Sequence, residues 1–173
     1  NIKTIKVVEK SLNSNQIKIS YSEALLWSNN KLNSISKGNI VHKILEYIHT
    51  AKDVANALKT VTENGIISQN EISSFKKIIY QIINDEELSI FYKPNSLIFN
   101  EKIILKSQSE NAKPDKVVIK ENVAFLLDYK TGEKKEEHKQ QLLAYEKLLN
   151  EMNYLVKKKT LVYISNNIEI VNL

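Results

Sequence analysis

The fold of this chain is decided by residues 113–132, which read KPDKVVIKENVAFLLDYKTG. Two short apolar runs, Val117–Ile119 and Val123–Leu127, flank a polar segment centred on Glu121 and Asn122. Short runs of β-branched and aliphatic residues on either side of a polar turn predict a β-hairpin. With the turn placed at Glu121 and Asn122, the pairing of every other residue in the hairpin follows.

This register brings two aspartates together. Counting back from the turn pairs Val118 with Phe125 and places Asp115 opposite Asp128. Directly opposed residues of an antiparallel pair lie roughly 5 Å apart at Cβ, and like charges there are destabilising. Lys130 follows Asp128 by two positions and therefore points to the same face of its strand. The sequence predicts either a cation site made of two carboxylates beside one ammonium group, or a different register.

Both apolar runs are apolar on both faces, which is typical of strands in the middle of a sheet. An unpaired charge at the end of such a buried strand costs several kcal/mol. Simpler interpretations remain open beside the cation site. Asp115 follows Pro114 and suits a plain turn, and Lys130 can serve only as the salt-bridge partner of Asp128.

Composition narrows the class of protein. The chain has 173 residues, of which 42% are hydrophobic, so it can form a globular domain with a real core. It has no cysteine, which excludes disulfides, thiolate zinc sites and iron–sulfur clusters and suits a reducing, intracellular setting. No apolar run approaches the roughly 18 residues of a membrane span, so we expect no membrane contact.

The charge pattern is compatible with nucleic acid but does not identify it. The net charge is +5, and every basic residue is lysine. The absence of arginine removes bidentate guanidinium recognition of bases and phosphates. Three glycines are too few for a phosphate-cradling loop, so the chain contains no nucleotide motor of that kind.

Periodicity predicts an α/β domain with a mixed central sheet flanked by helices. Residues 1–19 are interpreted as an arm or linker from a preceding domain, and residues 20–173 as the domain itself. A short helix is expected over residues 20–27. The other expected helices cover residues 38–50, 53–63, 72–83 and 133–152, the third opened by a capping box at Ser68–Glu71. The expected strands cover residues 96–106, 113–119 and 123–131, followed by a terminal hairpin over 160–171.

Four motifs occur in a fixed order along the chain. Pro114-Asp115 followed by Asp128-Tyr129-Lys130 matches the PD-(D/E)xK pattern of metal-dependent nucleases, and residues 131–132 extend it to D-Y-K-T-G. Upstream, GNIVHKILE at residues 38–46 resembles a G-x-x-x-H-x-x-L-E helix. Downstream, QLLAY at residues 141–145 resembles a Q-x-x-x-Y helix. Together, over residues 20–173, they resemble the RecB-like nuclease domain at the C-terminus of AddA/RecB-type helicase–nucleases.

This resemblance implies a restriction-endonuclease-like fold and a role for each motif residue. It implies divalent-metal ligation by His42, Asp115, Asp128 and the Tyr129 carbonyl, catalysis by Lys130 with the two aspartates, and DNA contact by Gln141 and Tyr145. Glu101, on the preceding strand, is a further candidate ligand. Some relatives carry an iron–sulfur cluster, which this chain cannot.

The implied activity is hydrolysis of phosphodiester bonds in DNA with Mg²⁺ or Mn²⁺. Carboxylate oxygens suit Mg²⁺, and the imidazole of His42 is more comfortable with Mn²⁺. The resemblance further implies single-stranded DNA as substrate. It also implies a helicase motor, N-terminal in the parent chain or in a partner subunit, and a role in double-strand-break repair and recombination.

Other readings remain open. The chief alternative is a catalytically silent nuclease fold that acts as a DNA-binding or assembly module, and a third is a metal hydrolase that does not act on DNA. His42 and Tyr145 can also be core residues of their helices. His138 is expected at the surface and Lys157–Lys159 in a solvent loop.

Overall fold

The computed structural model describes residues 34–102, 104–105, 111–165 and 167–173. The described residues all belong to one compact unit, Asn33–Leu173. The arm expected over residues 1–19 and the helix expected over residues 20–27 lie outside the described residues.

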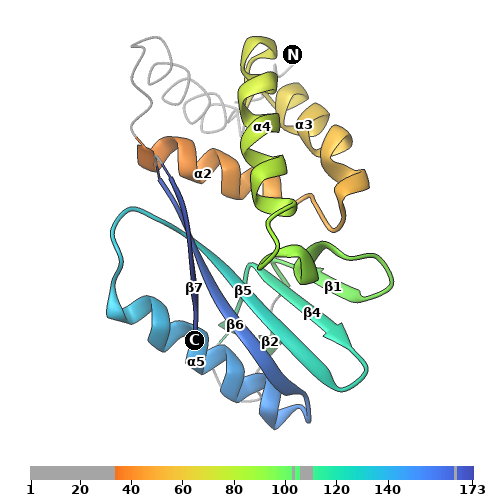
Figure 1. Ribbon diagram of the computed structural model, residues 1–173, viewed down its shortest axis with the longest axis vertical. Coiled ribbons are helices and arrows are strands. Elements are labelled where there is room, and N and C mark those ends of the chain that lie inside the picture. Colours follow the sequence, from red (N-terminus) through yellow and green to blue (C-terminus); the bar gives the residue numbers. More distant parts are fainter. Residues whose placement is uncertain (1–33, 103, 106–110, 166) are drawn as a thin grey trace, which may run out of the picture. The chain divides into compact units, whose positions relative to one another are not determined.

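A five-stranded mixed sheet organises the described unit (Figure 1). Its order is β1-β4-β5-β6-β7, with the long strand β5 in the centre. Only β5 and β6 are parallel, and the other neighbours are antiparallel. The strands are β1 (Leu97–Asn100), β4 (Lys116–Lys120), β5 (Val123–Thr131), β6 (Leu155–Ile164) and β7 (Ile168–Asn172). The predicted mixed α/β class is confirmed.

The predicted hairpin and its register are confirmed. Strands β4 and β5 pair from Lys120 with Val123 down to Lys116 with Leu127. Glu121, the first central turn residue, has φ 57°, the left-handed conformation that tight hairpin turns require. Beyond the last pair, the N–H of Tyr129, two residues after Leu127, donates a hydrogen bond of 2.6 Å to Oδ2 of Asp115. Asp115, one residue before Lys116, therefore lies against β5 next to Asp128.

The single strand predicted over residues 96–106 is wrong. Strand β1 ends at Asn100, because Glu101 has φ 53° and turns the backbone out of the extended conformation. The chain then forms β2 (Ile104–Leu105), which pairs with β3 (Asn111–Ala112) in a separate two-stranded sheet. Alternation of side chains from Leu97 therefore does not continue through Glu101.

Helices flank the sheet on both faces. They are α2 (Ser34–Leu45), α3 (Val54–Glu63), α4 (Ile72–Ile83) and α5 (Glu136–Glu151), with 3₁₀ turns η1 (Ala51–Asp53), η2 (Gln69–Glu71) and η3 (Ser89–Tyr92). The capping box of Ser68 and Glu71 is confirmed, and a second one joins Thr50 to Asp53. The predicted helix over residues 38–50 is displaced, since α2 begins four residues earlier and ends at Leu45.

Strand β6 begins five residues earlier than predicted and contains Lys157–Lys159, so the solvent loop expected there is wrong. The reason lies in the partners of the lysines. Lys159 pairs with Glu146 at 2.6 Å, and Lys158 donates to the backbone oxygen of Glu87 at 2.6 Å. These contacts satisfy the lysine ammonium groups within a strand. The sequence did not predict this part of β6 as a strand because three lysines interrupt its apolar pattern.

Two layers of side chains cover the two faces of the sheet. On one face, α5 packs against β4, β5 and β6, and this cluster contains Val117, Ile119, Ala124, Leu126, Leu142, Tyr145, Leu149, Leu161 and Tyr163. On the other face lies α2, whose His42 ring is 5.6 Å from the ring of Tyr129. In Figure 1, α2, α3 and α4 gather together while α5 lies by itself along the sheet. None of the helices in the described part combines the length and apolar character that crossing a membrane needs.

Candidate metal centre

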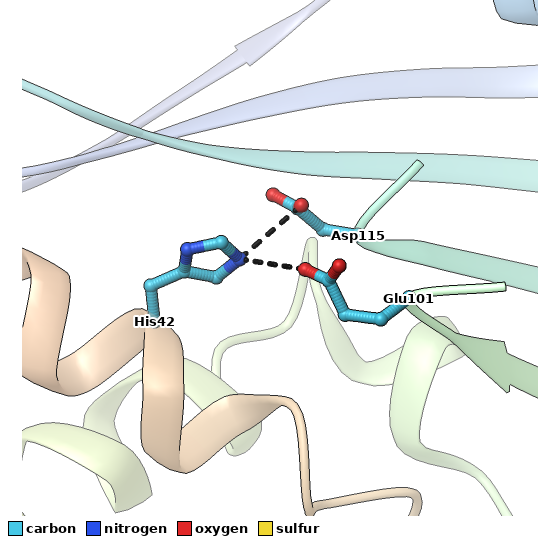
Figure 2. Close-up of side chains that lie close together, drawn as sticks. All are labelled: His42, Glu101 and Asp115. Atoms are coloured by element: carbon cyan, nitrogen blue, oxygen red, sulfur yellow. Dashed lines mark ion pairs between the residues drawn. The ribbon is translucent and has the colours of Figure 1, made fainter. Parts of the chain in front are cut away.

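Three side chains converge where α2 meets the ends of β1 and β4 (Figure 2). Nε2 of His42 lies 3.2 Å from Oε1 of Glu101 and 3.2 Å from Oδ1 of Asp115. One ligand atom from each residue lies within 4.8 Å of the other two. The side chains are 29, 18 and 11% exposed respectively, so the group opens to solvent. We call His42, Glu101 and Asp115 the metal-centre trio.

Backbone geometry holds the two carboxylates of the trio in place. The left-handed turn at Glu101 redirects this residue after β1, and its N–H donates to the carbonyl oxygen of Asp115 at 3.0 Å. Asp115 in turn accepts the hydrogen bond from the backbone of Tyr129. A turn, a strand start and the neighbouring strand therefore fix both acids.

Helix α2 brings His42 to these acids. Gly38, one turn earlier, lies so close to the sheet that a Cβ atom there would stand 2.6 Å from Cγ2 of Thr131 and 2.7 Å from the carbonyl oxygen of Ile164. The missing side chain lets α2 approach the ends of β5 and β6. The ring of Tyr129 then supports His42 from the sheet.

The carboxylates change the protonation of the histidine. Burial alone would lower the pKa of His42, but contact with Asp115 and the charges of Asp115 and Glu101 outweigh it, so the pKa is raised. Burial alone would raise the pKa of Asp115, but contact with His42 and the Tyr129 N–H outweighs it, so that pKa is lowered. Burial raises the pKa of Glu101, and Asp115 adds to this against the ion pair with Lys113.

One buried atom fits a cation site. Nε2 of His42 lies between the two carboxylate oxygens but is aligned for a full hydrogen bond with neither, and it has no other partner in the described part of the chain. A nitrogen lone pair and two carboxylate oxygens form a donor set that suits Mn²⁺, and also Mg²⁺ if water completes the shell. These residues therefore fit the divalent ion that the sequence predicted.

Asp128 lies beside the trio, not in it. Its carboxylate is 2% exposed and pairs with Lys130, with 2.5 Å between Oδ2 and Nζ. Burial and the charge of Asp115 raise its pKa to about 6, although Lys130 opposes the shift. The structure thus gathers Glu101 with His42 and Asp115 and leaves Asp128 as the neighbour that carries the lysine.

Lys130 connects Asp128 to helix α5. Its ammonium group donates to Oε1 of Gln141 at 2.7 Å, and the Gln141 amide donates to the Tyr145 hydroxyl at 2.8 Å. Burial, then the charges of Asp128 and Asp115, raise the pKa of Tyr145 to about 12, so the hydroxyl stays protonated. The predicted Q-x-x-x-Y pair therefore reaches the charged patch, and Tyr145 also packs into the core beneath α5.

The remaining candidates from the sequence are Tyr129 and His138. The backbone carbonyl of Tyr129 remains a predicted ligand. The side chain of Tyr129 is buried, and its hydroxyl is hydrogen-bonded to the hydroxyl of Tyr92. His138 is half-exposed, and its Nδ1 lies 3.1 Å from the Tyr163 hydroxyl.

Sequence reasoning missed Asn100 and Lys116, which lie next to Glu101 and Asp115. A lysine at the start of an apolar strand was the one available signal.

No protein-family model matches the chain, and no curated protein matches it.

Proposed function

We propose that this chain is a metal-dependent DNA nuclease domain with a restriction-endonuclease-like fold. The observation that carries the proposal is the convergence of His42, Glu101 and Asp115, from three separate segments, beside the ion pair of Asp128 and Lys130. Acidic ligands next to one held ammonium group match what phosphodiester hydrolysis requires: a place for a divalent ion and a positive charge beside the phosphate.

The trio would hold the ion, with Asp128 at its edge. When bound, a divalent cation supplies Lewis-acid stabilisation of phosphate charge and helps to generate a nucleophile from water. The Asp115 side chain is anchored by a backbone N–H, so its free oxygen is fixed toward the ion site. His42 must give up its proton to serve as a ligand, because only the neutral ring has a lone pair to offer.

Lys130 would act on the substrate. It is held between Asp128 and Gln141, and Asp128 lies close enough to Asp115 and His42 for their charges to act on it. A preorganised positive charge stabilises the negative charge that builds up on phosphate during hydrolysis. Gln141 and Tyr145 would orient this lysine and line the DNA side of the site.

By its motifs, the domain would act on single-stranded DNA delivered by a helicase motor, inside the cell, during double-strand-break repair and recombination. Mg²⁺ or Mn²⁺ would be the cofactor.

The test is cleavage of labelled single-stranded DNA by the purified chain with Mn²⁺. We expect Lys130→Ala to lose about 10²–10³ in rate while Mn²⁺ still binds. Lys59→Ala, which removes an exposed lysine on α3, is the matched control and should cleave like the unmodified chain. Absence of Mn²⁺-dependent cleavage above the Lys130→Ala level would overturn the proposal.

One observation favours the silent module as a second candidate. The acids already have cations of the chain beside them, since Lys130 pairs with Asp128 and Lys113 pairs with Glu101. A module of this kind would bind DNA without added metal, and Asp128→Ala would leave its affinity unchanged. For the nuclease, chelation of the metal and Asp128→Ala should both reduce productive DNA binding.

A further inference from the structure

Lys116 is a fully buried lysine that the proposed chemistry does not use. It has 0% relative exposure and forms no ion pair within the described ranges. Its ammonium group donates to the carbonyl oxygen of Ile48 at 2.8 Å and to Oδ1 of Asn100 at 2.6 Å, and it lies 4.6 Å from the centre of the Tyr92 ring. Because a buried lysine is costly, its environment needs an explanation.

Asn100 completes the same network from the neighbouring strand. Its amide group donates to the carbonyl oxygens of Glu46 at 2.9 Å and of Ile48 at 3.0 Å. These carbonyls belong to the turn that follows the last residue of α2. Side chains from β1 and β4 therefore hold this turn, directly after the C-terminal end of α2.

The network lies next to every member of the metal-centre trio. Asn100 precedes Glu101, Lys116 follows Asp115, and the carbonyls that they bind lie four and six residues after His42. A second link runs through the tyrosines: the Tyr92 hydroxyl is hydrogen-bonded to that of Tyr129, whose ring supports His42. One buried cluster thus joins the three segments that carry the ligands.

We propose that Lys116 and Asn100 are positioning residues that fix α2 to β1 and β4, so that His42 stays within bonding range of Glu101 and Asp115. This inference rests on the proposed function, because it assigns the two residues to its metal centre. Without these donors, the turn after α2 would keep unpaired carbonyls over a buried surface. Among the described residues, no other hydrogen bond joins the backbone of Glu46 or Ile48 to the sheet.

The test compares two variants with a control in the other core. Lys116→Met removes the ammonium group that donates to Ile48 and Asn100 and retains the length of the side chain. Asn100→Ala removes the amide that donates to Glu46 and Ile48, and it replaces Lys116→Met in the test if that variant fails to fold. Leu149→Ala creates a cavity beneath α5, away from α2. It should lower the free energy of unfolding at least as much as either variant does. Each folded protein is titrated with Mn²⁺ by calorimetry. In metal-free protein, the nuclear Overhauser effect between the rings of His42 and Tyr129 reports their contact.

We expect Lys116→Met and Asn100→Ala to weaken Mn²⁺ binding by about 10–100-fold, as losses of residues that orient ligands typically do. Both should also weaken the contact between His42 and Tyr129. Leu149→Ala should keep the affinity within about twofold of the unmodified chain and should keep the ring contact, because it does not touch α2.

The outcomes separate this inference from the proposed function. If the unmodified chain binds no Mn²⁺, the proposed function fails, and the ring contact alone decides whether the two residues position His42. If the chain binds Mn²⁺, an unchanged ring contact in a folded variant overturns the inference, whatever the affinity. An unchanged affinity with a lost ring contact overturns it as well. If Leu149→Ala weakens Mn²⁺ binding and the ring contact as much as the two variants do, the effect comes from lost global stability, and the inference is overturned.

Discussion

At the scale of single residues, each acid in or next to the metal-centre trio already has a basic side chain beside it. Lys113 pairs with Glu101, Lys130 with Asp128, and His42 lies 3.2 Å from Asp115. A divalent ion would therefore exchange with these contacts instead of entering a bare acidic cluster. Among the described residues, Lys130 has a further partner, Gln141, and Lys113 has none, so Lys130 is the lysine that we expect to remain at the site after such an exchange.

The burial of Lys116 predicts how the free energy of unfolding changes with pH. Burial lowers its pKa to about 7, and the charge of Asp53 offsets only part of this. The other titratable groups that contact it or respond to its charge are Tyr92 and His49. Between about pH 7 and the ordinary lysine value of 10.5, the unfolded chain holds a proton that the folded chain has released. The free energy of unfolding should therefore rise with pH across this window.

We expect this rise to reach at most about 1.4 kcal/mol per pH unit in the unmodified chain and to be absent in Lys116→Met. Urea unfolding at pH 7, 8 and 9 measures the difference, and a chain without cysteine has no thiol titration to confuse it. Parallel pH profiles for the two proteins would show that the folded lysine keeps its ordinary pKa.

At the scale of elements, the hairpin was predictable and the segment around Glu101 was not. The register of β4 on β5 followed from the two-residue turn at Glu121 and Asn122, because the length of a hairpin loop fixes how its two strands pair. The left-handed turn at Glu101 has no such signature: it follows an apolar strand without glycine or proline. As a result, alternation predicted one long strand, and Glu101 was a weak candidate although the structure places it in the trio.

The site residues divide in the same way. His42, Asp115, Asp128 and Lys130 could be proposed because each belongs to a short motif with its own spacing. Asn100 and Lys116 could not, since what matters is their contact with a helix end some 50–70 residues away. Such long-range contacts depend on how α2 packs on the sheet, which local sequence does not encode.

The packing of α2 gives the second prediction. A Cβ atom at Gly38 would stand 2.6–2.7 Å from Thr131 and Ile164, so Gly38→Ala must push α2 away from the sheet. Such overpacking costs about 1–3 kcal/mol, although alanine favours a helix over glycine by about 1 kcal/mol. Because His42 lies one turn further on, we expect Mn²⁺ affinity to fall as well. Calorimetric titration and urea unfolding measure the two effects.

Gly65 provides the matched control. It has φ +71° and no atom near a potential Cβ, so Gly65→Ala strains the backbone by about 1–2 kcal/mol without displacing α2. Its Mn²⁺ affinity should stay unchanged. Equal affinities in Gly38→Ala and Gly65→Ala would mean that the close approach of α2 does not set the position of His42.

At the scale of the whole unit, the metal-centre trio joins segments that are far apart in the chain. Its members come from α2, from the turn after β1 and from the residue before β4, between residues 42 and 115. In the unfolded chain these side chains are not together, so a metal ion that binds them should bind the folded state almost exclusively. Metal binding and global stability are therefore coupled by mass action.

This coupling gives the third prediction. At a free Mn²⁺ concentration of about 100 times Kd, the folded state should gain about 2.7 kcal/mol. For a domain of this size, that gain corresponds to a rise in Tm of roughly 5–10 °C. Thermal unfolding followed by circular dichroism across a series of Mn²⁺ concentrations measures the rise. It should continue to grow with the logarithm of the concentration, as binding to the folded state alone requires.

His42→Ala should abolish the rise, because it removes the ligand that α2 contributes. His49→Ala is the matched control: His49 is exposed, and only its backbone N–H bonds to Asp53, so this variant should respond to Mn²⁺ like the unmodified chain. Surface binding of Mn²⁺ to scattered acids would raise Tm equally in both variants. A difference between the two histidines therefore locates the stabilising ion at the junction of α2 with the sheet, and equal responses would remove the trio as its site.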